Sequence, residues 1–431
     1  MFGFFKSQEK KMRENAANWL ELAEKVYHYR RDVLSATQVS ELQGQIAGLR
    51  ELLKERAGAE KLKLAVERAE EVLRRTGGAI YPKSALVENV EFFLVAAIVI
   101  LGIRTYFVQP FKIPTNSMWP TYNGMTPEVF TRTSDEPGAA AKVIRFLAFG
   151  ARPKRVNAPV GGEVIVPLGI VQGNAYVPFR EVPGRKWLVI PTTLREYTLL
   201  VGDQPVTVTV PADFDFEWAV RDGLFPELAT SGMPGRVDLA RLAERPGATV
   251  TRAGFHLLRT GKQVKEGDRV LAFDVITGDQ LFVDRISYHF FRPKVGQGFV
   301  FRTDHIASEY MRDGRTGGQL EQYYIKRLVG VPGDKLQVRQ PVLFRNGEPI
   351  SGSTAFDANA HTRGKYRGYF SLGLLAEGKT VTVPAHKFFA MGDNSGNSQD
   401  SRYWGYVPAK DVVGRPLFVY YPFTRHWGPA R

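Results

Sequence analysis

The chain has 431 residues and contains no cysteine. Disulfides, thiolate catalysis and cysteine-ligated zinc or iron–sulfur sites are therefore excluded. The seven histidines are scattered and no His-Glu-x-x-His spacing occurs, so a zinc peptidase or a Ser-His-Asp triad has little support. No Gly-rich phosphate-binding loop is present, which argues against nucleotide use. We therefore expect a protein that needs neither a metal nor another cofactor.

Long basic runs are also missing, although the formal net charge is +14. The positive charge is spread along the chain and accompanies no nucleic-acid-binding motif, so we predict no nucleic-acid partner. A basic domain tethered beside a bilayer would instead be attracted to anionic lipids. Lipids of the cytoplasmic membrane are therefore expected partners.

The N-terminal region lacks the early apolar run of a cleavable signal sequence. Its apolar residues recur at helical spacings of three and four, in two sets. The sets are Val39, Leu42, Ile46, Leu49 and Leu53, followed by Leu62, Val66, Ala69 and Leu73. We predict a cytoplasmic helical region over residues 1–84, with a helical hairpin. Two interpretations stay open: a coiled-coil partner site, or an amphipathic hairpin that packs on itself or lies at the membrane surface.

A long apolar segment follows Glu91 and contains one charge, Arg104, before Lys112. Twenty such residues in a helix span about 30 Å, the thickness of the hydrocarbon core of a bilayer. A buried helix of a soluble protein is the alternative. Basic residues before the segment favour an N-terminus inside the cell. We therefore predict a single transmembrane helix over residues 85–110, with the rest of the chain outside.

From residue 111 onward, short alternating runs such as VTVTV and GFVFRT are bounded by Gly, Pro, Asn and Asp. This pattern is typical of β-strands. Asn346-Gly347 lies between two such runs and predicts a hairpin with a type I′ turn. Residues 236–245 are the exception and favour a few helical turns. The C-terminal part is therefore predicted to be mostly β.

Ser117 lies in the string FKIPTNSMWPT, directly after the apolar segment and between Pro114 and Pro120. The two prolines hold the chain extended or in a turn, where a hydroxyl can be presented rather than buried in a helix. A serine hydroxyl is a poor nucleophile until a base takes its proton, and a buried lysine can be that base without a histidine.

Lys326, in YYIKRLVGVPGD, is a candidate for such a base. Its apolar neighbours along the chain would solvate an ammonium poorly, and burial lowers the pKa of a lysine toward the range that a general base requires. An ordinary strand lysine would instead extend its amine into water.

Three segments in this order resemble the motifs of bacterial type I signal peptidases. They are IPTNSMWPT at 113–121, KRLVGVPGD at 326–334 and GDNSGNSQDSRYWG at 392–405. The resemblance implies a signal-peptidase-like β fold with Ser117 as the nucleophile and Lys326 as the base. It also implies a hydrolase that removes signal peptides from exported preproteins and cleaves after small residues at −1 and −3. The expected location is the bacterial cytoplasmic membrane, with the catalytic domain on the extracytoplasmic (periplasmic) side; contact with the secretion machinery is left open.

The resemblance assigns supporting roles to five further residues. Thr115, where the family usually has serine, would help to bind the oxyanion, and a turn hydroxyl bonded to its own backbone is the alternative. Ser398 would hydrogen-bond and orient the lysine amine. Asp400 and Arg402 resemble a paired brace near the site, with a structural role favoured over a catalytic one, and Asp393 could serve in either way.

Four apolar positions match those that line the small-residue pockets in the family. They are Ile113, Pro114, Met118 and Ile325. Ordinary core packing is the alternative role for all four.

The catalytic domain is expected over residues 111–431, interrupted at 123–277 by an insertion that is β-rich. In many family members the segment beginning near residue 278 follows the serine after only a few residues. We expect the insertion to pack to one side and to leave the catalytic groups intact. Two other functions stay open: a non-catalytic membrane-anchored scaffold, and a self-cleaving Ser/Lys regulator, which would be soluble.

Overall fold

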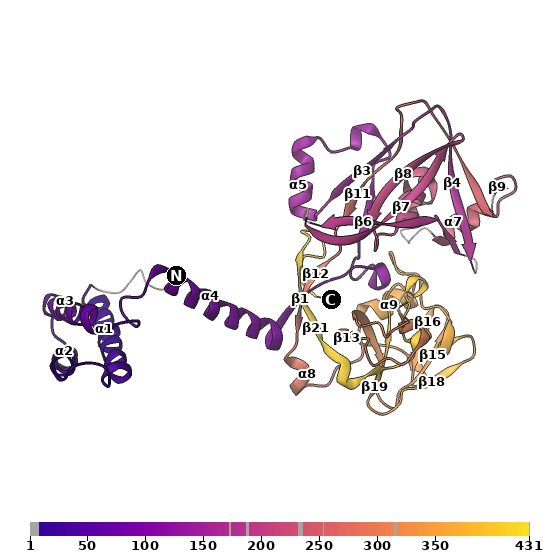
Figure 1. Cartoon of the computed structure of the whole chain (residues 1–431). Coiled ribbons are helices and arrows are strands. Elements are labelled where there is room, and N and C mark those ends of the chain that lie inside the picture. Colours follow the sequence, from indigo (N-terminus) through magenta and orange to yellow (C-terminus); the bar gives the residue numbers. More distant parts are fainter. Residues whose placement is uncertain are drawn as a thin grey trace. The chain divides into compact units, whose positions relative to one another are not determined.

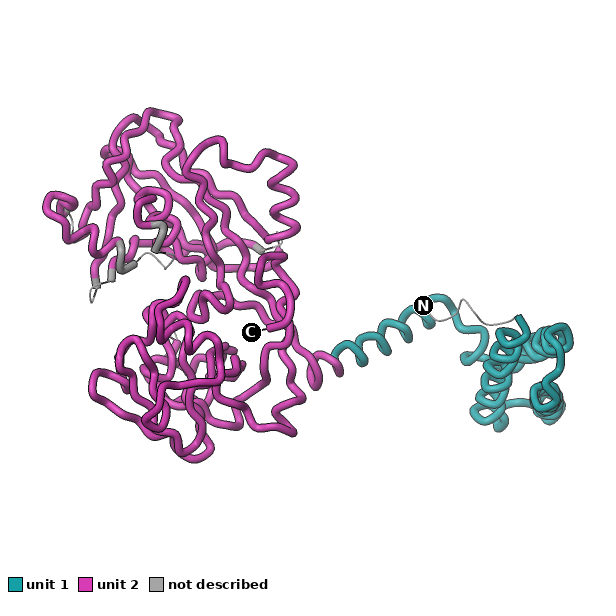
Figure 2. Tube along the Cα trace, turned by 180° about the vertical axis from the view of Figure 1, so that it is seen from behind, with its two compact units in different colours: residues 1–101 teal, residues 102–431 magenta. Residues whose placement is uncertain are grey.

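The computed structural model describes residues 8–171, 174–186, 189–231, 236–252, 254–313 and 317–430. The chain divides into two compact units, residues 1–101 and 102–431, which are coloured separately in Figure 2. Each unit is described by itself below.

Unit 1 contains three helices that pack on one another. They are α1 (Gln8–Arg30), α2 (Ala36–Lys54) and α3 (Ala59–Thr76). Helix α2 begins with a capping box, in which Ser35 and Gln38 satisfy each other's backbone N–H groups. The expected hairpin corresponds to α2 and α3, and its periodic residues, such as Leu42 and Leu62, are buried. Helix α1 completes a three-helix arrangement because Ala23 and Val26 are buried in the same cluster.

The apolar segment forms α4 (Ala85–Gly102), which continues as a π-helical turn, Ile103–Phe107. Together they are long and apolar enough to cross a membrane, and none of their most apolar stretch is buried. The predicted span of 85–110 extends too far, because Val108 and the next residues already belong to a strand that pairs with its neighbour.

Unit 2 contains the predicted β structure (Figure 1). Its first sheet has eight antiparallel strands in the order β1-β12-β21-β13-β14-β19-β20, and β22 pairs with β21. These strands are β1 (Val108–Lys112), β12 (Gln280–Asp284), β13 (Gly298–Arg302), β14 (Tyr323–Gly330), β19 (Lys387–Met391), β20 (Val407–Pro408), β21 (Val412–Tyr421) and β22 (Gly428–Pro429). Strand β14 holds Lys326, and the segment that contains Ser117 follows β1.

A four-stranded sheet in the order β17-β16-β15-β18 also belongs to the part of unit 2 outside segment 123–277. Its strands are β15 (Lys335–Arg339), β16 (Val342–Arg345), β17 (Glu348–Pro349) and β18 (Thr380–Thr382). The predicted hairpin joins β16 and β17. Asn346 and Gly347 both have positive φ angles, 55° and 90°, as a type I′ turn requires.

Segment 123–277 builds two further antiparallel sheets and its own hydrophobic cluster. One sheet contains β4 (Gly162–Val171), β5 (Asn174–Tyr176), β6 (Phe179–Lys186), β7 (Ile190–Val201), β8 (Gln204–Pro211), β9 (Thr249–Arg252) and β10 (Phe255–Val264), and the other contains β2 (Thr126–Val129), β3 (Arg152–Asn157) and β11 (Arg269–Ile276). Three helices accompany them: α5 (Ala139–Phe149), α6 (Phe216–Leu224) and α7 (Arg236–Ala243). Helix α7 lies where the helical turns were predicted.

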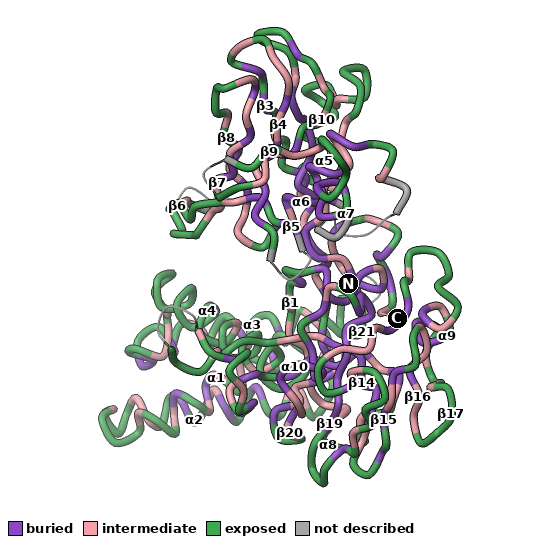
Figure 3. Tube along the Cα trace, turned by 90° about the vertical axis from the view of Figure 1, so that its right-hand side faces the viewer, coloured by how far each residue is buried: buried purple, intermediate pink, exposed green. Residues whose placement is uncertain are grey.

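The two ends of this segment lie side by side. Thr126 pairs with Ile276, and the backbone N–H of Asp279 donates to the carbonyl of Asn123 at 2.8 Å. The segment therefore leaves and rejoins the rest of unit 2 at one place, through β2 and β11. Figure 3 shows buried residues both in segment 123–277 and in the rest of unit 2. These buried residues form separate hydrophobic clusters.

Candidate active site

Ser117 lies in a short 3₁₀ turn, Asn116–Met118, shortly after β1. The side chain of Asn116 fixes this turn, because its amide donates to the carbonyl of Met125 and its oxygen accepts from the N–H of Gly124. The N–H of Asn394 donates to the carbonyl of Ser117 at 3.1 Å. The serine is therefore held by backbone contacts on both sides of the turn.

Lys326 extends from β14 to the same point, and its Nζ lies 2.5 Å from Ser117 Oγ. Both residues are buried, with exposures of 4% and 9%. Burial lowers the pKa of the Lys326 amine from 10.5 to about 8; nearby Asp400 and Asp393 oppose this effect, and Arg402 adds to it. A neutral amine at this position can accept the proton of the serine hydroxyl.

Thr115 precedes the turn and lines the same groove as Ser117. It occupies the N-cap position, but its side chain makes no capping hydrogen bond. Gly124 packs directly against its carbonyl group, so closely that a Cβ at position 124 would lie 2.3 Å from the carbonyl carbon of Thr115. A glycine is therefore required where the chain turns back past the serine segment.

Ser398 lies in the groove beside Lys326, but the predicted hydrogen bond between them is not formed. Its Oγ is buried and has no hydrogen-bond partner among the residues that the structure describes. The hydroxyl lies against Gly392, where an added Cβ would come within 2.2 Å of it. The prediction was wrong in this contact because the side chain packs on the backbone of the neighbouring strand end.

Asp393 forms a buried ion pair with Arg327, the residue after the lysine. The two carboxylate oxygens accept from Arg327 Nε at 2.7 Å and Nη2 at 2.5 Å, and Thr121 also donates to this carboxylate. Alternate residues of a strand point to opposite faces, so Arg327 fixes β14 from the side opposite to Lys326. Asp393 therefore braces the strand that presents the amine.

Asp400 and Arg402 form a second ion pair, at 2.8 Å, in which neither side chain is exposed. Asp400 also accepts from the N–H of Gly392 at 3.0 Å, and Arg402 donates to the hydroxyl of Ser395 at 2.8 Å. The pair thus fixes the loop that holds the carbonyl of Ser117.

A groove of about 700 Å³ surrounds the pair of Ser117 and Lys326. Two extended segments, 111–117 and 322–326, form part of its lining. Ile113, Pro114 and Ile325 lie among the lining residues. Met118 does not line this groove, because its side chain is fully buried in the cluster beneath β1.

Residues of segment 123–277 also line the groove, although we expected none there. They are Arg195, Ala212, Asp213, Phe214 and Asp215. Trp218 of α6 makes an edge contact with Trp119 at 5.7 Å, two residues from the serine. No motif in this segment indicated that it lines the groove. The position of the segment depends on the pairing of β2 with β11, which no motif in the sequence reveals.

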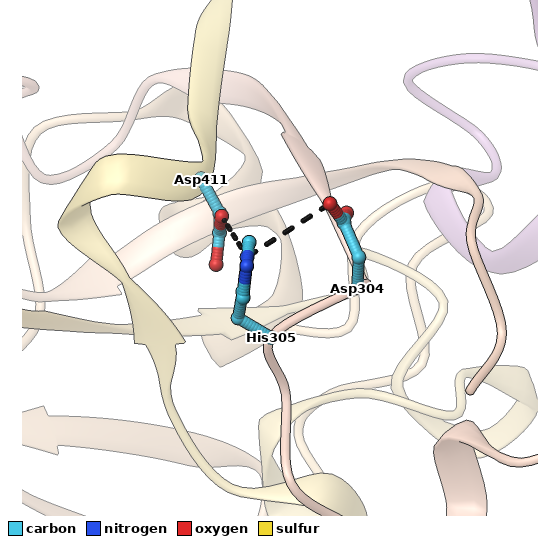
Figure 4. Close-up of side chains that lie close together, drawn as sticks. All are labelled: Asp304, His305 and Asp411. Atoms are coloured by element: carbon cyan, nitrogen blue, oxygen red, sulfur yellow. Dashed lines mark hydrogen bonds and ion pairs between the residues drawn. The ribbon is translucent and has the colours of Figure 1, made fainter.

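A cluster of Asp304, His305 and Asp411 is the one group among the described residues with a possible metal-binding arrangement (Figure 4). His305 Nδ1 lies 2.7 Å from Asp411 and 3.8 Å from Asp304. The guanidinium of Arg302 lies 3.4 Å from Asp304 and 3.6 Å from Asp411, so a cation already neutralises both carboxylates. We interpret the cluster as an ion-pair network.

The chain is similar to several known proteins. Residues 272–421 match the family described as signal peptidase, peptidase S26. A probable signal peptidase I of Synechocystis sp. is 31% identical over 151 residues, which are 35% of this chain and 66% of that protein. Signal peptidase I of Bacillus licheniformis is 33% identical over 130 residues, 29% of this chain and 67% of that protein.

A crystal structure of a signal peptidase I from Enterococcus faecalis V583 is 26% identical and covers 29% of this chain and 97% of that one, with a TM-score of 0.22. The chain spans between 57% and 66% of the length of the first three relatives, from Synechocystis and Leptolyngbya laminosa. The family match and the sequence relatives define a class, the S26 peptidases. The chain belongs to the signal peptidase I family.

Proposed function

We propose that this protein is a membrane-anchored serine endopeptidase that removes signal peptides from exported preproteins. The observation that carries the proposal is the buried contact of 2.5 Å between Lys326 Nζ and Ser117 Oγ. Supporting it, burial lowers the pKa of the lysine toward neutrality, and the groove around the pair is large enough for an extended peptide.

In the proposed mechanism, the neutral amine of Lys326 takes the hydroxyl proton of Ser117 as Oγ attacks the scissile carbonyl carbon. The ammonium then gives this proton to the departing amine, and an ester remains on Ser117. Lys326 next takes a proton from water as the water oxygen attacks the ester carbonyl carbon, and the ammonium then gives this proton to Ser117 Oγ as the bond to the acyl group breaks. One lysine thus serves both half-reactions.

The oxyanion of each tetrahedral intermediate would accept hydrogen bonds from the N–H of Ser117 and from the hydroxyl of Thr115. Such donors stabilise charge that develops only in the transition state. The exposed position of Thr115 in the groove and its lack of a capping bond support this role.

For the substrate, we propose that an extended signal peptide lies between segments 111–117 and 322–326. The apolar side chains of Ile113, Pro114 and Ile325 would restrict the pockets for the residues at −1 and −3 to small side chains. Helix α4 and its π-helical turn would anchor the protein, with residues before 84 in the cytoplasm and residues after 112 outside.

The test is cleavage of a preprotein with alanine at −1 and −3 by the purified full-length chain in liposomes. Ser117→Ala and Lys326→Ala should each abolish cleavage, whereas the exposed Ser134→Ala and Lys335→Ala should not. N-terminal sequencing of the product checks the cleavage position. Near-wild-type cleavage by either variant of the proposed pair would contradict the mechanism.

A further inference from the structure

Helix α5 turns its apolar side chains outward, which is the reverse of an ordinary surface helix. None of its eleven residues is buried. Val143, Ile144 and Leu147 are exposed by 60%, 64% and 66%. Single exposed apolar residues are normal, but a contiguous group on one short helix marks an interaction surface.

The outward orientation of these apolar side chains is fixed by Arg145, the charged residue of α5 that faces the protein. Its Nε donates to Asp274 on β11 at 2.7 Å, and its Nη2 donates to Glu128 on β2 at 2.7 Å. The carboxylate of Asp274 is almost completely buried, so loss of this pair would leave an unpaired charge. The helix therefore cannot rotate its apolar face toward the sheet without breaking a buried ion pair.

The apolar surface continues beyond the helix onto the C-terminal segment. The N–H of Phe423 donates to the carbonyl of Ala148 at 3.0 Å, and the rings of Phe423 and Trp427 lie 6.3 Å apart. We call the resulting surface the α5 patch; its members are Val143, Ile144, Phe146, Leu147, Phe423 and Trp427, all of them exposed.

We propose that the α5 patch lies in the interfacial region of the lipid bilayer, beside the point where the membrane span ends. This proposal rests on the anchoring function proposed above. It adds a second membrane contact, made by the segment that interrupts the catalytic part of the chain.

The connection to the span supports a bilayer as the occupant. The span ends at Phe107, and β1 begins at the next residue. The far end of β1 pairs with Gln280, which pairs with Tyr421, whose hydroxyl donates to the carbonyl of Phe146. Five residues of strand extend about 17 Å and neighbouring strands lie about 5 Å apart, so α5 is tethered within one strand length and two strand spacings of the end of the span. Figure 1 shows α5 and β1 along the same edge of unit 2.

The charge and residue types also fit a bilayer better than a protein partner. Helix α5 exposes Lys142 and has no acidic residue, which suits a surface of anionic lipids. Trp427 is of the residue type that is enriched at membrane interfaces. A patch that faces lipid also needs none of the shape complementarity that a protein interface requires.

The absence of cysteine allows a direct test in the full-length chain. An environment-sensitive fluorophore is attached to Ile144→Cys in vesicles of zwitterionic and anionic phospholipid, and quenching by lipids with a quencher on the acyl chain is measured. We expect at least twofold quenching at position 144. Matched labels at Lys142, beside the apolar face, and Lys265, at the opposite end of β11, should be quenched little.

A second pair of variants tests the patch itself. Val143→Glu should reduce the quenching at position 144, whereas Val250→Glu, a valine of similar exposure (57%) on β9, should not. Equal quenching at positions 144 and 265 would overturn the proposal. Protection from aqueous iodide without quenching by lipid would also overturn it, since a protein partner or a second copy would then cover the patch.

The two proposals fail separately in this experiment. Loss of preprotein cleavage by the unlabelled wild-type chain would count against the peptidase function, whereas the quenching is measured without any substrate. Release of the whole chain from vesicles at high pH would count against the span.

Discussion

The lowered pKa of Lys326 predicts the pH dependence of the proposed peptidase. With a pKa of about 8, the neutral amine makes up about 1% of the enzyme at pH 6, about 10% at pH 7 and about half at pH 8. We therefore expect kcat/KM to rise about tenfold from pH 6 to pH 7, about fivefold from pH 7 to pH 8, and to level off near pH 9. The assay is initial cleavage of a fluorogenic preprotein peptide in detergent.

Two results would contradict a pKa of about 8 for Lys326. A rate that stays level between pH 6 and pH 8 would mean that the group which must lose a proton titrates lower. A rate that rises about tenfold from pH 8 to pH 9 and continues to rise to about pH 10.5 would mean that the lysine keeps its ordinary pKa of 10.5. Circular dichroism across the same range is the control for unfolding.

The same pKa shift predicts a stability effect at position 326. Between about pH 8 and 10.5 the folded chain binds fewer protons at this site than the unfolded chain, so stability rises with pH there and is lowest below pH 8. Replacement by methionine removes the ionisable group. We expect Lys326→Met to raise the free energy of unfolding by roughly 3 kcal/mol at pH 7, and by less than about 1 kcal/mol at pH 10, while abolishing cleavage. An equal gain at both pH values in thermal unfolding would contradict this explanation.

The remaining predictions concern the supports of the site and the interrupting segment. Asp400→Asn should destabilise the protein by about 3–5 kcal/mol, because Arg402 would be left buried and unpaired; denaturant unfolding measures this, and an effect below about 1 kcal/mol would contradict it. Gly392→Ala should lower kcat far more than it raises KM, because its Cβ would lie 2.4 Å from the carbonyl oxygen of Ser117. Replacing residues 125–276 with a short Gly/Ser bridge should raise KM, because residues of that segment line the groove. An unchanged KM would mean that the segment plays no part in substrate binding.

Local features of this protein could be predicted from its sequence alone. Spacings of three and four residues predicted the buried faces of α2 and α3, because helical periodicity alone places such residues on one side. Asn346-Gly347 predicted its hairpin because few residue pairs adopt two successive positive φ angles. The motifs around Ser117 and Lys326 also identified the candidate pair, although the roles of both residues stay predictions.

The meeting of distant segments depends on tertiary packing and could not be predicted from local sequence. Ser117 and Lys326 are 209 positions apart, and the burial that lowers the lysine pKa comes from β14 and the loops packed around it. Residues of segment 123–277 line the groove because β2 and β11 pair where this segment leaves and rejoins the rest of unit 2. Helix α5 looks amphipathic in sequence, and the ordinary expectation would bury its apolar side. Arg145 reverses that orientation because its two carboxylate partners lie on β2 and β11, which local sequence cannot bring together.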